Sequence, residues 1–400
     1  MTDTQRASET DLPPPVVARS ARPTPADDGA PDKKRDVAGD GPKFALWTAL
    51  VPLLALAMVP LLPPEAFGGA AAGILFVVLI GAVFTAVHHA EVIAHKVGEP
   101  FGTLVLAASV TIIESSLIIS IMLSGDGGNP TLARDTLFAT LMIVLNGIMG
   151  LCVIVGGFRF GQQGFQAPGA AAFLTVLATS ATLTMVLPVF TASAGGPTFT
   201  AGQLAFVSVA ALVLYGVFLF IQTIRHRDYF LPEIAAGDED VHAAPPTLRL
   251  TLISGVLLLV ALTAVVLLAK SLSYPIESAV RGVGIAAPAA AVGAIVASLV
   301  LLPEGIAALH AARRNRLQTS LNLALGSGLA TISLTIPAVA AVSLFLGQPL
   351  ILGLGPKEIV LLFLTLVVSA LTLGGGRTTV LHGAVHLVIF AVFLYLLAVP

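Results

Sequence analysis

Long runs of apolar residues, separated by short segments that hold most of the charges, fill the chain from Phe44 to its C-terminal end. Most runs have about 20 residues, the length that an α-helix needs to cross the hydrocarbon core of a bilayer. The strands of a membrane β-barrel would instead alternate apolar and polar residues. The pattern predicts an all-α polytopic membrane protein with about 11 transmembrane helices, near residues 44–62, 68–90, 101–124, 136–157, 168–191, 201–224, 249–270, 285–309, 319–346, 357–373 and 379–399.

The composition agrees with a chain that lies mostly in lipid. Of the 400 residues, 56% are hydrophobic and only 10% are charged, whereas soluble domains carry about 25% charged residues. The net charge of -2 gives no indication of a nucleic-acid partner. The single cysteine, Cys152, excludes an intramolecular disulfide, and we expect it to pack within a helix.

The distribution of Lys and Arg predicts the orientation in the membrane. Residues 1–42 are polar and rich in Pro, Asp and Ala, which is typical of a disordered tail. The first apolar run begins too late for a secretory signal. With the N-terminus inside, thirteen Lys and Arg residues near the membrane fall inside and four fall outside. Because cytoplasmic loops are enriched in these residues, we expect a cytoplasmic N-terminus, an outside C-terminus and a bacterial inner (plasma) membrane.

The longest internal polar segment divides the chain into two sets of five spans. Five is an odd number, so two such sets have opposite orientations in the membrane, which is the inverted-repeat plan of many transporters. The expected units are a cytoplasmic tail (1–42), an N-terminal transmembrane helix (43–66), a first repeat (67–224), an acidic cytoplasmic linker (225–248) and a second repeat (249–400).

Two pairs of glutamates occupy matching places in the two repeats. The motif "EVIAHKVG" begins at Glu91, and "ESAVRGVG" begins at Glu277. Glu114 follows the first motif by sixteen residues, and Glu304 follows the second by twenty. Glu114 and Glu304 are the only charged residues near the centre of any predicted span. A mid-membrane carboxylate costs at least about 2.5 kcal/mol, so such residues are usually functional.

Two facing carboxylates can hold either a cation or protons. They repel each other when both are ionised, so that one must take up a proton or a cation must bridge them. Hard divalent cations prefer carboxylate oxygens supplemented by carbonyls, amides and water, and two protons can replace such a cation without net charge. Pro303 favours a kink that frees carbonyls beside Glu304. Further oxygens are expected from Thr111, Ser115, Asn146, Gly147, Gly326 and Ser327. The alternative is that each glutamate is permanently protonated and only joins helices.

The two motifs around these glutamates resemble those of the calcium/cation antiporter superfamily, and most closely the bacterial calcium (sodium, potassium)/proton antiporters. The second, "PEGIAALHAARRNRLQTSLNLALGSGLATI", has Glu304, Asn315, Leu317 and "LGS" in the places of the family pattern. The first, "GEPFGTLVLAASVTIIE", ends in Glu114. The resemblance covers roughly residues 68–399. It implies that Glu114 and Glu304 bind the transported cation and protons.

The chain departs from the family pattern near both glutamates. The pattern has Asn three residues before each Glu, where this chain has Thr111 and Leu301. The Gly-Ser pair after the first Glu is replaced by Asn146-Gly147. A site with fewer amide ligands could favour Ca²⁺ less strongly and admit Na⁺ or K⁺.

Several other groups have weaker claims to a role. Glu91 and Glu277 are expected at membrane edges, as entrances or gates or as solvated helix ends. Histidines near the first motif could sense pH, because histidine titrates near neutrality, or could simply be interfacial. The acidic "GDED" of the linker could bind Ca²⁺ weakly but lacks EF-hand spacing. The histidines near the first motif are His88, His89 and His95. His310 is a candidate proton relay, and His382 and His386 have the i, i+4 spacing of metal ligands, although a transition-metal site would need more ligands.

The sequence therefore predicts a secondary transporter that exports Ca²⁺, with Na⁺ or K⁺ as alternatives, in exchange for H⁺ by alternating access. The ions are substrates, membrane lipid is the surrounding partner, and no cofactor is expected. There is no Walker A pattern and no hydrolytic triad, so an enzyme is not predicted. A passive cation channel with an acidic pore lining is the alternative, and proton counterflow distinguishes the two.

Overall fold

The computed structural model describes residues 46–98, 101–122, 130–231, 246–285, 287–348 and 350–399. The expected tail (1–42) and most of the expected linker (225–248) lie outside these residues. Within them nearly all of the backbone is helical, and the two strands have only two residues each, β1 (Gln163–Gly164) and β2 (Arg377–Thr378).

The order of the helices fits an N-terminal helix followed by two sets of five spans. α1 (Leu46–Leu61) comes first. The first set comprises α2 (Pro64–Val97), α3 (Phe101–Met122), α4 (Leu132–Met142) with η1 (Ile143–Ile148) and α5 (Met149–Phe160), α6 (Ala167–Ala181) with η2 (Thr182–Val186) and α7 (Leu187–Phe190), and α8 (Ala201–Phe220) with η3 (Ile221–Arg225). After η4 (Arg227–Phe230), the second set comprises α9 (Leu248–Gly282), α10 (Pro288–Arg313), α11 (Leu317–Ala330) with η5 (Thr331–Thr335) and α12 (Ile336–Leu346), α13 (Pro356–Gly374), and α14 (Val380–Ala398).

The prediction of a polytopic all-α membrane protein is confirmed. In the described part of the chain, nine helices are long and apolar enough to cross a membrane, and two shorter apolar helices complete the expected set. Two spans are longer than expected, because α2 continues to Val97 and α9 continues to Gly282. Polar residues appear in both extensions, but helical structure persists beyond the apolar run, and an ion pair between Glu277 and Arg281 links the last turns of α9.

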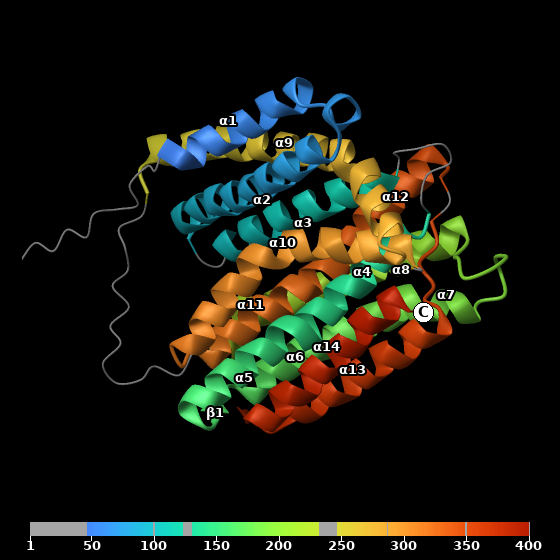
Figure 1. The fold of residues 1–400 in the computed structure, drawn as a ribbon. Helices are drawn as coiled ribbons and strands as arrows, with labels where there is room; N and C mark the ends of the chain where they lie inside the picture. The colour runs from blue at the N-terminus through green and yellow to red at the C-terminus, as the bar shows by residue number, and fades with distance from the viewer. Residues whose placement is uncertain are drawn as a thin grey trace, which may run out of the picture. The chain divides into compact units, whose positions relative to one another are not determined.

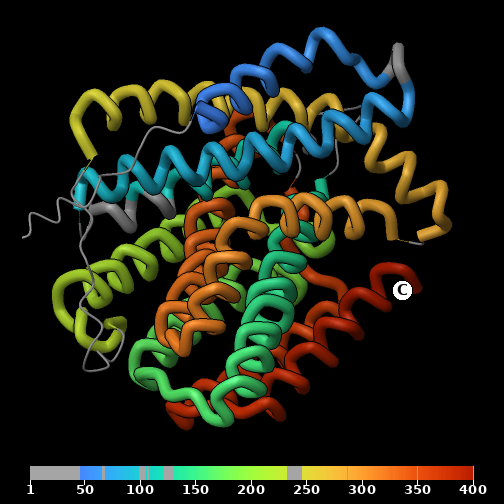
Figure 2. Tube along the Cα trace, turned by 60° about the vertical axis from the view of Figure 1, so that its left-hand side comes forward, coloured from blue at the N-terminus to red at the C-terminus, as the bar shows by residue number. Residues whose placement is uncertain are grey.

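The first helices of the two sets pack against each other. α9 lies along α2, and α1 contacts both of them. Figures 1 and 2 show α1, α2 and α9 together on one side of the bundle. The motif glycines that follow α2 and α9 have similar φ angles, 74° at Gly98 and 76° at Gly284. Only glycine adopts this region without strain, so the backbone supports the alignment of the two motifs.

The second helix of each set crosses the third helix of the other set. α3, which carries Glu114, packs against η5 and α12, and α10, which carries Glu304, packs against α5 and η1. The third span of each set has a π-helical segment at this crossing, η1 in the first set and η5 in the second. In η5 the cause is visible, because Pro337 lacks the N–H that would bond to the carbonyl of Ser333 in an α-helix. π-segments are frequent at functional sites.

The two ends of the bundle are joined by different contacts. At one end β1 pairs with β2, and Gln163 Nε2 donates to Asn315 Oδ1 at 2.9 Å; we call this the linker end, because η4 lies there too. At the other end the extended segment 350–355 bonds to three parts of the first set. Its amides at Ile351, Gly353 and Leu354 donate to the carbonyls of Pro130, Pro197 and Met185. We call this segment the strap and this end the strap end.

Candidate ion-binding site

Glu114 is a buried carboxylate held by three threonine hydroxyls. Its side chain is 2% exposed. Thr331 Oγ1 donates to Oε2 at 2.7 Å, and Thr335 Oγ1 donates to the same oxygen at 3.3 Å. From the other side, Thr140 Oγ1 donates to Oε1 at 3.3 Å. Both carboxylate oxygens are therefore engaged, by residues of α4 and η5.

Glu304 lies in a different environment, in the lining of a cavity. The cavity has a volume of about 310 Å³ and also touches Thr111 and Ser327. Glu304 is half-buried, and its Oε2 atom is buried without a hydrogen-bond partner. At the linker end the cavity is lined by the exposed residues Arg227 and Leu231. A small ion in this cavity would therefore meet a carboxylate with an unused oxygen. We call it the Glu304 cavity.

Thr331 connects the two carboxylates. It lines the Glu304 cavity, and its hydroxyl makes the shortest hydrogen bond to Glu114. Ser327, Thr331 and Thr335 are four residues apart, so they lie on one face of α11 and η5. The Ser327 hydroxyl has no hydrogen-bond partner. This polar face leads from the cavity to Glu114 through oxygen atoms.

The two glutamates share one hydroxyl neighbour, because Thr331 lines the cavity of Glu304 and donates to Glu114. Among the described residues, no Lys, Arg or His side chain forms an ion pair with Glu114 or Glu304. The described chain also contains no group of three His, Cys, Asp or Glu side chains that could hold a metal. A bound cation would thus combine the two carboxylates with hydroxyl, carbonyl and water oxygens.

Some of the predicted supporting residues lie at this site. Thr111, Gly326 and Ser327 line the Glu304 cavity. Ser115 is buried, but its hydroxyl donates to the backbone carbonyl of Thr111 at 2.6 Å. The proton of Ser115 is therefore used within α3.

Asn146 and Gly147 are placed differently from the expected supporting role. Asn146 Nδ2 donates to Thr365 at 2.9 Å, and Asn146 Oδ1 lies 3.0 Å from His386 Nδ1. His386 Nε2 in turn lies 3.0 Å from the hydroxyl of Thr372. An amide oxygen only accepts, so His386 carries its proton on Nδ1. The Asn146 side chain thus joins η1 to α13 and α14 and is hydrogen-bonded to neither glutamate, while Gly147 faces the ring of Phe390.

His89, His382 and Cys152 have structural surroundings. His89 Nε2 donates to the carbonyl of Thr48 at 2.9 Å. Pro52, four residues after Thr48, lacks the N–H that would otherwise bond to that carbonyl in α1. Cys152 is 1% exposed and packs among apolar residues, as expected. The nitrogen Nδ1 of His382 accepts from the amide of Thr379 at 3.2 Å, at the start of α14.

Glu91 and Glu277 differ although their sequence positions match. Both are exposed. Glu277 forms an ion pair of 2.7 Å with Arg281, one turn further along α9. Glu91 lies on α2, which packs against α10, the helix of Glu304. Their expected roles as entrances or gates stay predictions.

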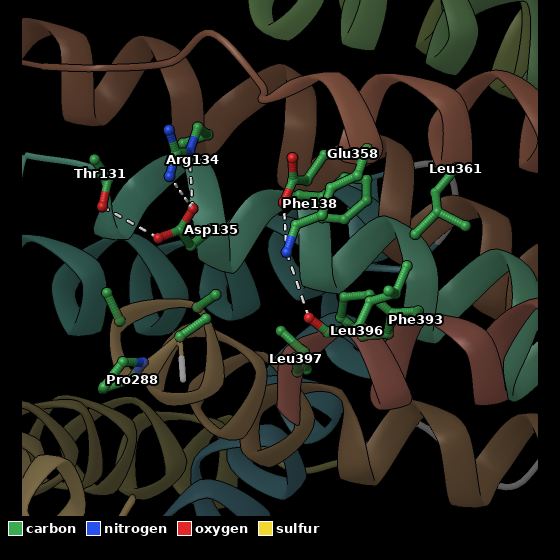
Figure 3. A pocket seen from close by; sticks show the side chains of 14 residues that line it. Thr131, Arg134, Asp135, Phe138, Pro288, Glu358, Leu361, Phe393, Leu396 and Leu397 are labelled. Carbon is green, nitrogen blue, oxygen red and sulfur yellow. Dashed lines mark hydrogen bonds and ion pairs between the residues drawn. The ribbon is translucent and has the colours of Figure 1, made fainter. Parts of the chain in front are cut away.

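A second pocket lies at the strap end and contains both signs of charge. Its volume is about 230 Å³. Figure 3 shows Asp135 between Thr131 and Arg134, with an Arg134–Asp135 ion pair of 2.7 Å. Lys357 pairs with Glu358 at 3.7 Å in the same pocket. Because each acid has a basic neighbour, this pocket offers less attraction to a cation than the Glu304 cavity.

The three threonines around Glu114 were not predicted from the sequence. Thr331 and Thr335 could have been found, because they continue the helical face of Ser327 at intervals of four residues. Thr140 could not, since its contact with Glu114 depends on how α4 lies against α3.

Comparison with known proteins identifies relatives over most of the chain. The family model described as "Sodium/calcium exchanger protein" matches residues 66–224 and 253–399. The y4hA protein of Sinorhizobium fredii is 51% identical over 359 residues, which cover 89% of this chain and 96% of the relative. The sodium-potassium/proton antiporter ChaA of Escherichia coli is 38% identical over 318 residues, which cover 79% and 85%. The solved structure of native YfkE, 16% identical, has the same fold, with a TM-score of 0.68 over 88% of this chain and 100% of that chain.

The two matched ranges correspond to the two sets of five spans. The first runs from α2 to η3, and the second from α9 to α14, so α1 lies outside both. This division agrees with the repeat that the sequence predicted, and the match confirms the resemblance to the calcium/cation antiporters. The chain belongs to the sodium/calcium exchanger protein family.

Proposed function

We propose that the protein is a cation/proton antiporter in which Glu114 and Glu304 alternately hold a cation and protons. The observation that carries this proposal is the pair of mid-span carboxylates joined by Thr331, one facing a cavity and one buried. Buried carboxylates without a basic partner are costly in a membrane. When a cation is exchanged for protons, the negative charge of both carboxylates is compensated at each stage.

The chemistry is balanced for a divalent cation. When Ca²⁺ binds between two ionised carboxylates, the charges cancel, and two protons on the same groups also leave no net charge. Either loaded form can change its exposure to the two sides of the membrane, whereas the empty, doubly ionised form is costly to bury. This difference couples the outward step of the cation to the inward step of the protons.

The threonine hydroxyls suit both loaded forms. A hydroxyl has one proton to donate and two lone pairs. Thr140, Thr331 and Thr335 donate to Glu114 here, and each still has lone-pair electrons that a nearby cation could share. Because Thr331 also lines the Glu304 cavity, its oxygen is well placed to bind an ion that lies between the two carboxylates.

The arrangement of the ends supports an inward-facing state. The Glu304 cavity reaches exposed residues at the linker end, whereas the strap packs Leu352 and Leu354, each 2% exposed, at the other end. The bias of Lys and Arg places the linker end in the cytoplasm. We therefore place the protein in a bacterial inner membrane, with the cavity open to the cytoplasm and the N-terminus inside.

Ca²⁺ is the proposed cation, with Na⁺ and K⁺ as further substrates. The oxygen-only lining suits any hard cation. The amide of Asn146 does not reach the carboxylates, and the chain has no Asn three residues before either Glu. The smaller number of amide ligands lessens the preference for Ca²⁺. The relative from Escherichia coli is named a sodium-potassium/proton antiporter, so the test must include Na⁺ and K⁺.

The test is cation-dependent proton movement in everted membrane vesicles that contain the protein. An acidic interior is established, and CaCl₂, NaCl or KCl is then added while a fluorescent dye reports the pH gradient. Addition of a transported cation should collapse the gradient, and vesicles with Glu114→Gln or Glu304→Gln should show no response. A cation-dependent response that remains in both variants would contradict the proposed site.

A passive channel is distinguished from an exchanger by whether Ca²⁺ movement is coupled to proton movement. In proteoliposomes with no ion gradient other than that of protons, an exchanger accumulates Ca²⁺ against its concentration. A channel only equilibrates Ca²⁺, and it moves no protons in return.

A further inference from the structure

The pocket at the strap end, which we call the strap-end pocket, corresponds to the Glu304 cavity with the two repeats exchanged. The lining of the Glu304 cavity includes α3 and α8, the second and fifth helices of the first set, and α11 with η5, from the third span of the second set. The lining of the strap-end pocket includes α10 and α14, the second and fifth helices of the second set, and α4, from the third span of the first set. In an inverted repeat, such counterparts face opposite sides of the membrane.

The helices around the strap-end pocket are packed more closely than their counterparts. α10 packs along α4, whereas in the described part of the chain α3 has little contact with α11. A Cβ atom at Gly293 of α10 would lie 2.9 Å from the backbone nitrogen of Thr136 and 3.2 Å from its hydroxyl oxygen. Glycine permits this close approach of two backbones. The rings of Phe138 and Phe393 also meet in this pocket, edge to face, with centroids 5.7 Å apart (Figure 3).

Behind the contact with Gly293, α4 carries a polar face that repeats the one on α11 and η5. Thr136 is 0% exposed, and its hydroxyl has no hydrogen-bond partner. Thr140, four residues later on the same face, donates to Glu114 at 3.3 Å. In the second set, Ser327 has the same unpaired hydroxyl and precedes Thr331, which donates to Glu114, by four residues. Hydroxyls therefore lead to Glu114 from both ends of the bundle.

The sealing glycine lies on the face of α10 that carries its glutamate. Gly293 precedes Glu304 by eleven residues, which is about three helical turns. The packed faces of α4 and α10 therefore run from the strap-end pocket, past Gly293 and Thr136, towards the two carboxylates.

We propose that the strap-end pocket and the hydroxyls of Thr136 and Thr140 form the outer half of the ion pathway, and that the contact of Gly293 with Thr136 closes it in this conformation. This inference rests on the proposed function. When α4 and α10 separate at Gly293, the cation leaves Glu114 along these hydroxyls, and protons enter by the same route.

This pathway suits passage more than retention. A threonine hydroxyl offers lone pairs to a cation and can donate its own proton. In the pocket, Asp135 is balanced by Arg134 at 2.7 Å, so a departing cation meets no uncompensated carboxylate. A conducting route must bind an ion weakly enough to release it.

The first test measures access to Thr136 from outside. Cys152→Ala removes the single natural cysteine, and Thr136→Cys then places a thiol on the proposed pathway. With CaCl₂ on both sides, a membrane-impermeant thiol reagent should label this cysteine in right-side-out vesicles and not in everted vesicles. Leu137→Cys is the matched control, because Leu137 is 0% exposed and points about 100° away on the same helix, and it should stay unlabelled.

The second test opens the closed end. In Gly293→Ala the added methyl group must displace the backbone of α4, so the conformation open to the outside is favoured. A tenfold bias of this equilibrium should speed the labelling of Thr136→Cys about tenfold and lower the apparent Ca²⁺ affinity on the cytoplasmic side. Phe393→Ala, which removes the ring contact without adding volume, should act in the same direction. Gly81→Ala is the matched control, because its methyl group would meet a side-chain atom of Val51, at 3.1 Å.

The third test concerns the hydroxyl of Thr136 itself. Thr136→Val should lower the maximal rate of exchange and leave the cytoplasmic Ca²⁺ affinity unchanged, because the affected step is release to the outside. Thr136→Ser should restore the rate. A rate in the Val variant equal to that of the wild type would remove this hydroxyl from the pathway.

Labelling does not require proton movement, so the two proposals can fail separately. Labelling of Thr136→Cys from the cytoplasmic side, or outside labelling that neither Gly293→Ala nor Phe393→Ala accelerates, would overturn the inference. If labelling is as expected but cations do not collapse a pH gradient in everted vesicles, the outer pathway stands and the proposed exchange fails. If exchange is normal and Thr136→Cys is never labelled from outside, only the inference fails.

Discussion

Glu114 and Glu304 hold equivalent places in two repeats, yet their surroundings differ in almost every respect. Glu114 is 2% exposed and receives hydrogen bonds on both oxygens. Glu304 is half-buried beside a cavity of about 310 Å³ and has an oxygen with no partner. The repeat therefore reproduces the position of the carboxylate but not its contacts.

This difference suits the alternating mechanism proposed for the protein. A buried polar atom without a partner is costly, so Glu304 gains most from an ion or a proton that arrives through the cavity. Both oxygens of Glu114 already accept hydrogen bonds from hydroxyls, so Glu114 gains less from that ion in this conformation. In an inverted repeat the opposite conformation would exchange these environments, with Glu114 facing a cavity at the strap end.

The largest expected effect comes from removing either charge. Glu114→Gln and Glu304→Gln should each abolish cation-dependent proton movement, because a neutral amide can neither release a proton nor balance a divalent cation. Everted-vesicle assays at matched expression measure this loss. Glu277→Gln, which alters an exposed ion pair, is the control. Near-normal exchange in one of the two variants would show that a single carboxylate suffices. The difference between the surroundings of Glu114 and Glu304 would then have no functional meaning.

The pH dependence of Ca²⁺ affinity shows whether both carboxylates exchange protons. Protons compete with the cation for the same oxygens, so the apparent affinity should fall as the pH falls and level off at high pH. If two protons are displaced, the fall should approach about a hundredfold per pH unit in acid. The two groups interact, so the curve belongs to the pair. A limit of about tenfold per pH unit would mean that only one of the two carboxylates exchanges its proton.

Thr331 should matter more than any other hydroxyl, since it belongs to both environments. Thr331→Val preserves the shape of the side chain but removes the 2.7 Å hydrogen bond to Glu114. A hydrogen bond to a charged group contributes about 1.5–3 kcal/mol, so the cation affinity should fall roughly tenfold or more. Calorimetric titration with CaCl₂ measures the change, and Thr331→Ser should restore most of the affinity. Equal losses in the Val and Ser variants would point to packing instead of the hydroxyl.

The smallest effect is expected at Ser327, on the Glu304 side. Its hydroxyl lines the cavity and has no hydrogen-bond partner. Ser327→Ala should lower the Ca²⁺ affinity by about threefold, the value of a modest neutral interaction. Because a buried hydroxyl without a partner costs free energy, the variant should also have an equal or higher Tm. A marked decrease in Tm would show that the Ser327 hydroxyl stabilises the helix packing.

Much of this architecture follows from the sequence, because a lipid environment leaves few alternatives. Every backbone polar group must be satisfied within the membrane, so apolar runs of sufficient length specify helices. The repeat was visible in "EVIAHKVG" and "ESAVRGVG", and with it the equivalence of Glu114 and Glu304. The helix ends were less certain, since α2 and α9 continue into polar sequence where the hydropathy no longer distinguishes helix from loop.

Tertiary structure alone decided which oxygen atoms meet which carboxylate. Asn146 was expected beside the glutamates, yet its amide joins His386 and Thr365. Thr140 reaches Glu114 across 26 positions of sequence, and Thr331 across 217. The sequence assigns each residue to a helix and approximately to a depth. The rotation of each helix, and therefore the direction of each hydroxyl, is set by the packing of neighbouring helices around the π-helical segments, which periodicity does not encode.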